Sequence, residues 1–409
     1  MSRNEKLLLC AILAVAFLIR LAVRTAFGER DFWENSYSGY YQLAENVVAG
    51  KGLCFDTTCA WWPPLYPLFL ALTALGGKHY LLVVVPQALI GAGTAFLSFL
   101  MARQLFGVTA GLISCALAAM YPYYVMHDTA LQETSMITLV TALAVWLLMQ
   151  ASCSNTLAAW SLAGLALGAM ALTRASVSPG IALAVVWVAA WGAAGNLRAR
   201  AIRVSVVLLT LALAIAPWLI RTYRLTGAPV LSSQTGRALW IGNNAETFSH
   251  YPRETIDKSE GEAWSKTLTA ADRTELERLP GEIQISDWFE RRGWAFIRAN
   301  PRLTFKRAFL KLGAGFWWRL NPLREPLAQA SYAVGYIPVA VLGLAGMFLA
   351  RRKPETILVA LLFVGFACTT AVFWAHTSHR AYLDVYWMVF AAPVVERIGR
   401  SCMRKTRLY

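Results

Sequence analysis

The chain has 409 residues, of which 57% are hydrophobic and only 15% are charged. A soluble globular domain has no use for so much apolar surface, so this composition indicates a membrane protein with several spans. The formal net charge of +15 does not point to nucleic acid, because the basic residues stand at the ends of apolar segments, where they set topology and meet anionic lipid.

About ten segments are apolar over the length that crosses a bilayer. The first follows a short basic N-terminus and runs into Arg20 and Arg24 rather than a small-residue cleavage site, which favours an uncleaved span over a signal peptide. Another apolar segment, 65–76, is too short to cross and predicts a re-entrant helix. The predicted spans are residues 7–27, 80–105, 108–124, 131–149, 157–172, 177–194, 204–220, 330–349, 357–374 and 381–395.

This arrangement sorts the basic clusters onto one face of the membrane. The runs 197–203, 351–353 and 397–407 share a face with both termini, as the positive-inside rule requires of the cytoplasmic side. We therefore predict an all-α membrane protein whose first outer loop, 28–64, and long hydrophilic segment, 221–329, face the other side.

Three parts follow from this topology. They are an N-terminal membrane module at 1–220, an extracytoplasmic segment at 221–329, and C-terminal spans with a basic tail at 330–409. Within the outer parts, apolar residues recur at the spacing of amphipathic helices that lie at a membrane surface. These helices are predicted at 37–49, 285–299 and 301–312.

The first outer loop is acidic and aromatic, and Asp31 and Glu34 are among its acids. Cys54 and Cys59 stand close enough for a local disulfide if the loop faces an oxidising compartment. The spacing alone leaves that pairing open. A zinc site is not predicted in the loop, because it contains no histidine to complete a ligand set.

The predicted topology gathers many polar and ionisable groups at the outer face. Such groups are costly near a bilayer unless they face protein or water, so their default interpretation is functional. Arginines can hold a phosphate through paired hydrogen bonds, and a carboxylate can take a proton from an attacking hydroxyl. Together they suit the displacement of a lipid phosphate from a sugar carbon. The groups are Glu29, Asp31, Glu34, His127, Asp128, Glu133, Arg174, Arg221, Arg224, Asn243, Asn244, His376, His379 and Arg380.

An ordered set of short motifs resembles the bacterial polytopic glycosyltransferases of the GT-C class. The resemblance is to their protein mannosyltransferase-like branch, which includes relatives of the aminoarabinose transferase of lipid A, and it covers nearly the whole chain. Each motif alone is weak, whereas the order is specific for the fold. The motifs are Pro63-Pro64 with Tyr66-Pro67, Tyr121-Pro122 with Glu133, Leu172-Thr173-Arg174, Pro217-Trp218 with Arg221, Ile241-Gly242-Asn243-Asn244, and His379-Arg380.

The resemblance implies transfer of a hexose or pentose from a polyprenyl-phosphate donor, usually with inversion and without a nucleotide. The acceptor would be an envelope glycan, lipid or protein on the periplasmic face of a bacterial inner membrane. No cofactor is required, although a divalent cation is compatible with the chemistry, and no metal ligands are assigned. The sugar, the acceptor, the lipid length, the metal dependence and the oligomeric state are not encoded in any motif we recognise.

One departure concerns the catalytic base. Members of this class usually carry an Asp shortly before a Tyr-x-x-Leu-Ala pattern, but the residues before Tyr40 are here Ser36 and Tyr37. Asp31 and Glu34 are the nearest acids and rank level as the base, with Glu133 in support. For the donor phosphate we expect Arg174, Arg221, Arg224, His379 and Arg380, and for the acceptor or sugar Tyr40, Asn243, Asn244, His127 and Asp128.

Two other classes of function remain open. A flippase or transporter of a lipid-linked sugar would show symmetric halves with helices broken at the bilayer midplane, and no such repeat is visible. A membrane scaffold without catalysis is the third class, because the displaced acid is compatible with lost activity. Replacing Asp31 and Glu34 and assaying sugar transfer would separate the three.

Overall fold

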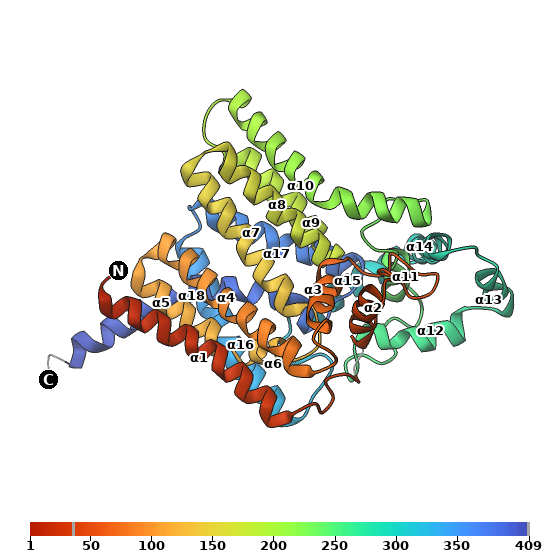
Figure 1. Cartoon of the computed structure of the whole chain (residues 1–409), viewed down its shortest axis with the longest axis horizontal. Coiled ribbons are helices and arrows are strands. Elements are labelled where there is room, and N and C mark those ends of the chain that lie inside the picture. The colour runs from red at the N-terminus through yellow and green to blue at the C-terminus, as the bar shows by residue number, and fades with distance from the viewer. Residues whose placement is uncertain (35–36, 407–409) are drawn as a thin grey trace.

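The computed structural model describes residues 1–34 and 37–406, which form helices joined by loops and contain no β-sheet (Figure 1). The prediction of an all-α membrane protein is confirmed. Ser36, next to the predicted Tyr-x-x-Leu-Ala pattern, and the last three residues of the predicted C-terminal part lie outside the described residues.

Within the described chain, 7 helical segments are long and apolar enough to cross a membrane. The bent pair α5 (Val108–Met120) and α6 (Pro122–Asp128) makes an eighth if it counts as one span, with a bend of 54°. Pro122 stands at the bend, where a missing N–H breaks the helical ladder. The seven are α1 (Arg3–Phe27), α4 (Tyr80–Phe106), α7 (Thr134–Ser154), the run of η1, α9 and η2 (Ala175–Gly192), α10 (Leu197–Thr226), α16 (Pro326–Leu349) and α17 (Pro354–Val372).

Three predicted apolar segments do not meet the same criterion of length and composition. The re-entrant segment forms α3 (Leu65–Ala74), which is short, as predicted, and α8 (Leu157–Thr173) has only 17 residues. The last predicted span lies in α18 (Thr377–Thr406), which carries charged groups within its apolar part. Residues 381–392 of α18 are all buried, so this helix lies inside the bundle and needs no continuous lipid-facing surface.

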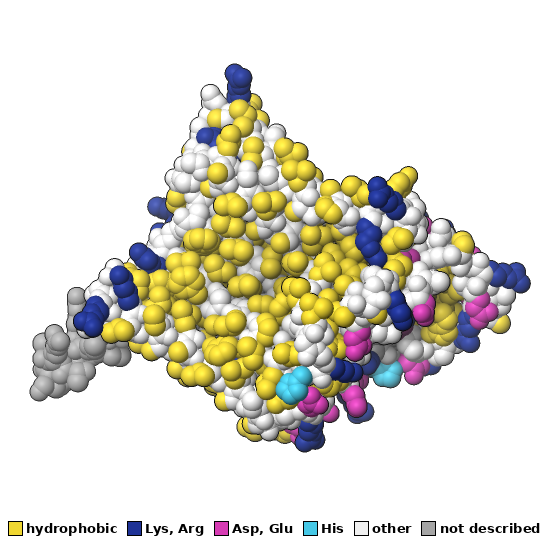
Figure 2. Space-filling view, viewed as in Figure 1, with side chains coloured by type: hydrophobic (Ala, Val, Ile, Leu, Met, Phe, Trp, Pro, Cys, Tyr) yellow, Lys and Arg dark blue, Asp and Glu magenta, His cyan; other side chains and the backbone are white. Residues whose placement is uncertain are grey.

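The helices outside the bundle gather at the end opposite to the two termini (Figure 1). In the same view a broad hydrophobic surface crosses the middle of the molecule, and the visible acidic and histidine side chains lie at the end with the short helices (Figure 2). The predicted amphipathic segments form helices there. These short helices are α2 (Ser38–Val48), α11 (Thr235–Gly242), η3 (Ile256–Ser259), α12 (Glu260–Thr267), α13 (Ala270–Glu277), α14 (Glu282–Ala299) and α15 (Pro301–Phe316).

Small residues let α18 approach α16 closely. A Cβ atom on Gly346 would lie 1.8 Å from the carbonyl oxygen of Phe390, and one on Gly343 would lie 2.8 Å from that of Trp387. Close helix contact of this kind is a common way for membrane helices to associate. It fixes the polar N-terminal turn of α18 at the same end of the bundle as the start of α7.

Candidate functional site

A buried ion pair, Glu133 with Arg174, is the centre of the candidate site. Glu133 directly precedes α7 and Arg174 directly follows α8, and because these helices are antiparallel neighbours the two residues meet at one end of the bundle. Arg174 donates from Nη2 and Nε to Glu133 Oε1, at 2.6 and 3.2 Å. The two side chains are 10% and 8% exposed, so the pair is shielded from bulk water.

The second carboxylate oxygen of Glu133, Oε2, is buried without a hydrogen-bond partner in the described part of the chain. The same holds for Nε2 of His127, whose Nδ1 meets the amide of Gln132. A buried polar atom without a partner costs about 1–3 kcal/mol, so natural proteins retain such atoms where a ligand or water completes them. Arg174 also donates from Nη1 to the carbonyl of His379 at 3.3 Å.

Tyrosines from the first outer loop cover the pair. Tyr40 stacks on Trp62 with ring centroids 4.2 Å apart and meets Tyr66 edge-on at 5.1 Å. Burial raises the pKa of Tyr37, and the negative charge of Glu133 raises it further. The pKa of Tyr40 is raised for the same two reasons. Both phenols are therefore neutral at physiological pH and can donate hydrogen bonds, but neither can serve as a base.

Two histidines lie on another side of Arg174. The rings of His376 and His379 have centroids 3.9 Å apart, and Trp374 lies 5.1 Å from His379. Burial lowers the pKa of His376 to about 4, an effect that Asp257 opposes and Arg174 reinforces. At neutral pH His376 is uncharged, so Arg174 is the cation that faces Glu133.

An apolar groove of about 690 Å³ lies on the side of the bundle, and its lining begins one helical turn from Glu133. Met136 of α7 lines it one helical turn beyond Glu133, and Leu65 lines it next to Tyr66. The groove opens between α2, α3, α4 and α7 and is large enough for part of a lipid chain. Its remaining lining residues are Val47, Val48, Leu68, Phe69, Ala71, Leu72, Leu75, Ile90, Leu139 and Val140.

Asp31 and Glu34 do not lie in this cluster. The Asp31 side chain is 84% exposed, has a left-handed backbone with φ of 53°, and forms its ion pair with the neighbouring Arg30 at 3.5 Å. Glu34 is exposed as well. The loop after α1 turns both carboxylates toward solvent, so neither of the two acids ranked as the base lies in the cluster with Arg174. Of the acids expected to act in catalysis, Glu133 is the one that the structure buries beside a guanidinium.

Three of the arginines expected at the phosphate have other surroundings. Arg221 donates to the carbonyls of Cys59 and Leu53, at 2.8 and 3.1 Å, and Arg224 is exposed in the last turn of α10. Arg380 is fully buried and donates to Asp384, to the carbonyl of Gly315 and to the hydroxyl of Tyr332. Arg380 and Asp384 form an ion pair at 2.9 Å, one helical turn apart on α18.

The asparagine pair forms a helix-end structure. Asn243 donates from Nδ2 to the carbonyls of Leu239 and Val372, at 2.8 Å each, which joins α11 to the end of α17. Asn244 donates to the carbonyl of Trp240 at 2.8 Å. These contacts engage both side chains with the backbone, so the structure gives the pair a role in holding α11.

Asp128 and its partner Arg20 form another buried ion pair, which the sequence did not reveal. Arg20 Nε lies 2.6 Å from Asp128 Oδ2, although 108 residues separate them in the chain. The available signal was Arg20 itself, because an arginine inside an apolar span seldom lacks an acidic partner. In the sequence, Arg20 was interpreted only as a basic residue near the end of the first apolar run.

The Cys54–Cys59 disulfide is formed, which resolves the question that the spacing left open. Glu282 of α14 accepts hydrogen bonds from the backbone N–H groups of Cys59 and Ala60, at 2.8 and 3.0 Å, while Arg221 of α10 holds carbonyls of the same loop. The disulfide loop is thus held between one acidic and one basic side chain, and it ties the first outer loop to the hydrophilic segment.

We expect the double variant Cys54→Ser/Cys59→Ser to lose about 2 kcal/mol in its free energy of unfolding, because the small closed loop no longer restricts the unfolded chain. A thermal melt in detergent would measure the loss, and a reducing agent should lower the melting temperature of the wild-type protein by the same amount. Cys368→Ser is the matched control, since Cys368 is an exposed free thiol. A double variant that melts like this control would contradict the expectation.

Lys311 of α15 is a fully buried lysine in the hydrophilic segment. Its ammonium donates to Asn243 Oδ1 at 3.1 Å and to the carbonyl of Val372 at 3.1 Å, at the end of α17. Burial lowers the pKa of Lys311 to about 7, and the nearby Arg307 lowers it further. In the unfolded chain the same group titrates near pH 10.4.

Between about pH 7 and pH 10 the unfolded chain therefore holds a proton on Lys311 that the folded chain lacks. The free energy of unfolding rises with pH across this window, because stability rises wherever the unfolded state binds more protons. Below pH 7 both states are protonated and this contribution is flat. We expect melting curves of Lys311→Met to lack the rise, with Lys306→Met as the exposed control. Parallel pH curves for wild type and Lys311→Met would refute this.

Comparison with known proteins gives the fold. A family profile described as dolichyl-phosphate-mannose-protein mannosyltransferase matches residues 62–220, a segment that includes Glu133, Arg174 and much of the groove. No curated protein matches the chain. Among solved structures, the archaeal oligosaccharyltransferase AglB from Archaeoglobus fulgidus, in complex with an inhibitory peptide and a dolichol-phosphate, has a TM-score of 0.57 at 14% identity.

That match covers 100% of this chain and 52% of AglB, and the apo form of the same enzyme gives identical values. The chain thus spans about half the length of the AglB structures. ArnT from Cupriavidus metallidurans bound to undecaprenyl phosphate has a TM-score of 0.46 at 15% identity, with 97% and 79% of the two chains covered. The chain has the polytopic fold of the GT-C glycosyltransferases, which confirms at the level of fold the resemblance in its motifs.

Proposed function

We propose that this protein is a membrane glycosyltransferase that moves a sugar from a polyprenyl-phosphate donor to a hydroxyl on an envelope glycan, lipid or protein. The active site would face the periplasm of a bacterial inner membrane. The observation that carries the proposal is the unpartnered Oε2 of Glu133, held beside Arg174 and one helical turn from the lining of the apolar groove. The AglB structure that shares the fold contains a dolichol-phosphate, a lipid phosphate of the kind that the proposed reaction would release.

In the proposed reaction Glu133 Oε2 takes the proton from the acceptor hydroxyl as its oxygen attacks the anomeric carbon. The bond from that carbon to the phosphate oxygen breaks, and the polyprenyl phosphate leaves with the electron pair. Arg174 compensates the charge of the leaving phosphate through N–H groups that Glu133 and His379 do not use. Attack from the face opposite to the phosphate inverts the configuration of the sugar.

The neutral phenols of Tyr37 and Tyr40 would donate hydrogen bonds to the sugar. One AglB structure is a complex with Zn and sulfate, but the described residues of this chain contain no group of three or more His, Cys, Asp or Glu side chains placed to hold a metal ion. The positive charge that a cation would supply at the phosphate is here assigned to Arg174.

A transfer assay with the groove blocked tests the proposal. We expect Leu139→Trp, which fills the groove beside α7, to raise the KM for an undecaprenyl-phosphate sugar by about tenfold, because a displaced chain loses about 1.4 kcal/mol of apolar contact. Leu213→Trp is the matched control, since Leu213 of α10 is 60% exposed and lies outside the groove. The measurement is radiolabelled sugar transferred by the purified protein in nanodiscs.

The same assay separates the alternatives. An equal KM in the two tryptophan variants would show that the groove does not bind the donor. Movement of the donor across vesicle membranes without any covalent product would show that the protein is a transporter and not a transferase. The absence of both transfer and transport with every polyprenyl-phosphate sugar tested would favour the scaffold.

A further inference from the structure

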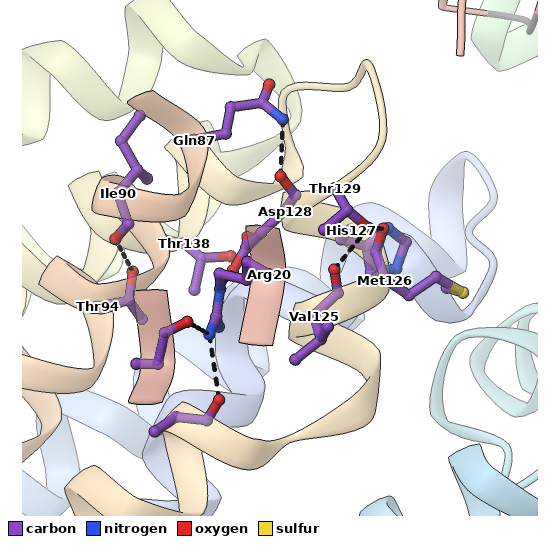
Figure 3. Close-up of polar contacts among 12 residues, drawn as sticks. Arg20, Gln87, Ile90, Thr94, Val125, Met126, His127, Asp128, Thr129 and Thr138 are labelled. Carbon is purple, nitrogen blue, oxygen red and sulfur yellow. Dashed lines mark hydrogen bonds and ion pairs between the residues drawn. The ribbon is translucent and has the colours of Figure 1, made fainter. Parts of the chain in front are cut away.

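The buried ion pair of Arg20 with Asp128 lies at the start of the turn that leads to Glu133. Arg20 of α1 is fully buried, and besides Asp128 it donates to the carbonyls of Ala16 and Ala119, at 2.6 and 3.1 Å. Figure 3 shows its guanidinium pointing from α1 toward Asp128 at the end of α6. Arg20 thus ties the first span to both halves of the bent pair α5 and α6.

Gln87 of α4 holds the same turn from another direction. Its Nε2 donates to the carbonyls of Asp128 and Ala130, at 3.0 and 2.8 Å, and its Oε1 accepts from the hydroxyl of Tyr66 at 2.8 Å. Gln87 is fully buried, so each of these bonds forms away from bulk water. One amide therefore joins the turn after α6 to the start of α3. Figure 3 shows its bond to the Asp128 carbonyl.

The packing around this network is close. A Cβ atom on Gly91, one turn beyond Gln87, would lie 2.3 Å from both Arg20 Nε and Asp128 Oδ2. Any side chain at that position would displace the ion pair. The three helices α1, α4 and α6 can therefore pack together here only because residue 91 is a glycine.

The network reaches the proposed base through a short piece of backbone. Asp128 and Ala130 are the anchored positions, and Glu133 follows three residues after Ala130 at the start of α7. We infer that Arg20 and Gln87 are positioning residues, which fix the 128–133 turn so that Glu133 Oε2 meets the acceptor hydroxyl. This inference rests on the proposed function, because it assigns a task to Glu133.

A merely structural role makes a different prediction for the ion pair. Apolar groups of similar volume can replace a buried pair with little or no loss of stability. The double variant Arg20→Met/Asp128→Leu removes both charges but leaves the Asp128 carbonyl for Gln87. If the pair serves only stability, the folded double variant should turn over like wild type. If it positions Glu133, turnover should fall although the protein is folded.

The test compares this double variant and Gln87→Leu with wild type in the transfer assay. We expect kcat to fall about 10- to 100-fold, the loss typical of a misplacement near 1 Å, while the donor KM stays within about twofold. Arg20→Lys keeps a cation against Asp128 and should lie between wild type and the double variant. Gln104→Leu is the matched control, because Gln104 also bonds an amide across helices, to Gln150, at the other end of α4.

Wild-type kcat in Gln87→Leu or in the folded double variant would overturn the inference, as would a rise in KM at unchanged kcat. If the double variant does not fold, the kcat values of Gln87→Leu and Arg20→Lys decide whether these residues position Glu133. Glu133→Gln in the same assay separates the two proposals. An inactive Glu133→Gln with a fully active Gln87→Leu would remove the positioning role alone, whereas a fully active Glu133→Gln would remove the base and, with it, the need to position it.

Discussion

Replacing Glu133 by glutamine is expected to lower the rate of sugar transfer about 10³-fold, which is the usual contribution of a general base. The amide has the same shape as the carboxylate, so the groove and the tyrosines are unchanged. It cannot take a proton from the acceptor hydroxyl. Single-turnover transfer from a radiolabelled polyprenyl-phosphate sugar, followed in wild type and variant under the same conditions, measures the loss directly.

Two controls isolate this effect. Glu133→Gln leaves Arg174 buried without a counter-charge, so a melting curve must show that the variant is folded. Asp31→Asn and Glu34→Gln remove the exposed acids of the first outer loop and should transfer sugar at the wild-type rate. If either of them loses as much activity as Glu133→Gln, or if Glu133→Gln is fully active, Glu133 is not the base.

The class of fold was predictable because its signals are local. A span is a continuous apolar run, and the helices at 37–49, 285–299 and 301–312 each carry their own periodicity, so α2, α14 and α15 appear where expected. The pair of Arg380 with Asp384 depends only on one helical turn. The disulfide needed a spacing of five residues and then a fold that brings the two sulfurs together.

The candidate site was only partly predictable because its contacts are not local. Glu133 lies just inside the predicted span 131–149, yet its partner Arg174 is 41 residues further along the chain, at the end of the next helix. Asp31 and Glu34 have the right chemistry and sequence position, but the direction of the loop after α1 decides their exposure. Nothing in the local sequence shows that Arg221 turns toward the disulfide loop rather than toward a phosphate.

The largest loss of stability is expected for Arg380→Met, at about 3–5 kcal/mol in the free energy of unfolding, because it leaves Asp384 buried with an uncompensated charge. Arg380 lies 3.9 Å above the ring of Tyr336 and also holds the carbonyl of Gly315 at the end of α15. Tyr121, at the bend between α5 and α6, donates to the Asp384 carboxylate at 3.0 Å. One guanidinium therefore joins α15 and α16 to α18, and through Asp384 it reaches that bend.

Chemical unfolding in mixed micelles would measure the loss. The double variant Arg380→Met/Asp384→Leu removes both charges and should recover about 2 kcal/mol of the loss, because about 1–3 kcal/mol remains for the Tyr121 hydroxyl that loses its acceptor. Recovery shows that the cost of Arg380→Met is the unpaired carboxylate and not the lost packing. If the double variant is as unstable as Arg380→Met, the guanidinium acts chiefly through Gly315 and Tyr332. If Arg380→Met unfolds like wild type but transfers no sugar, the arginine serves the phosphate, as the motif first suggested.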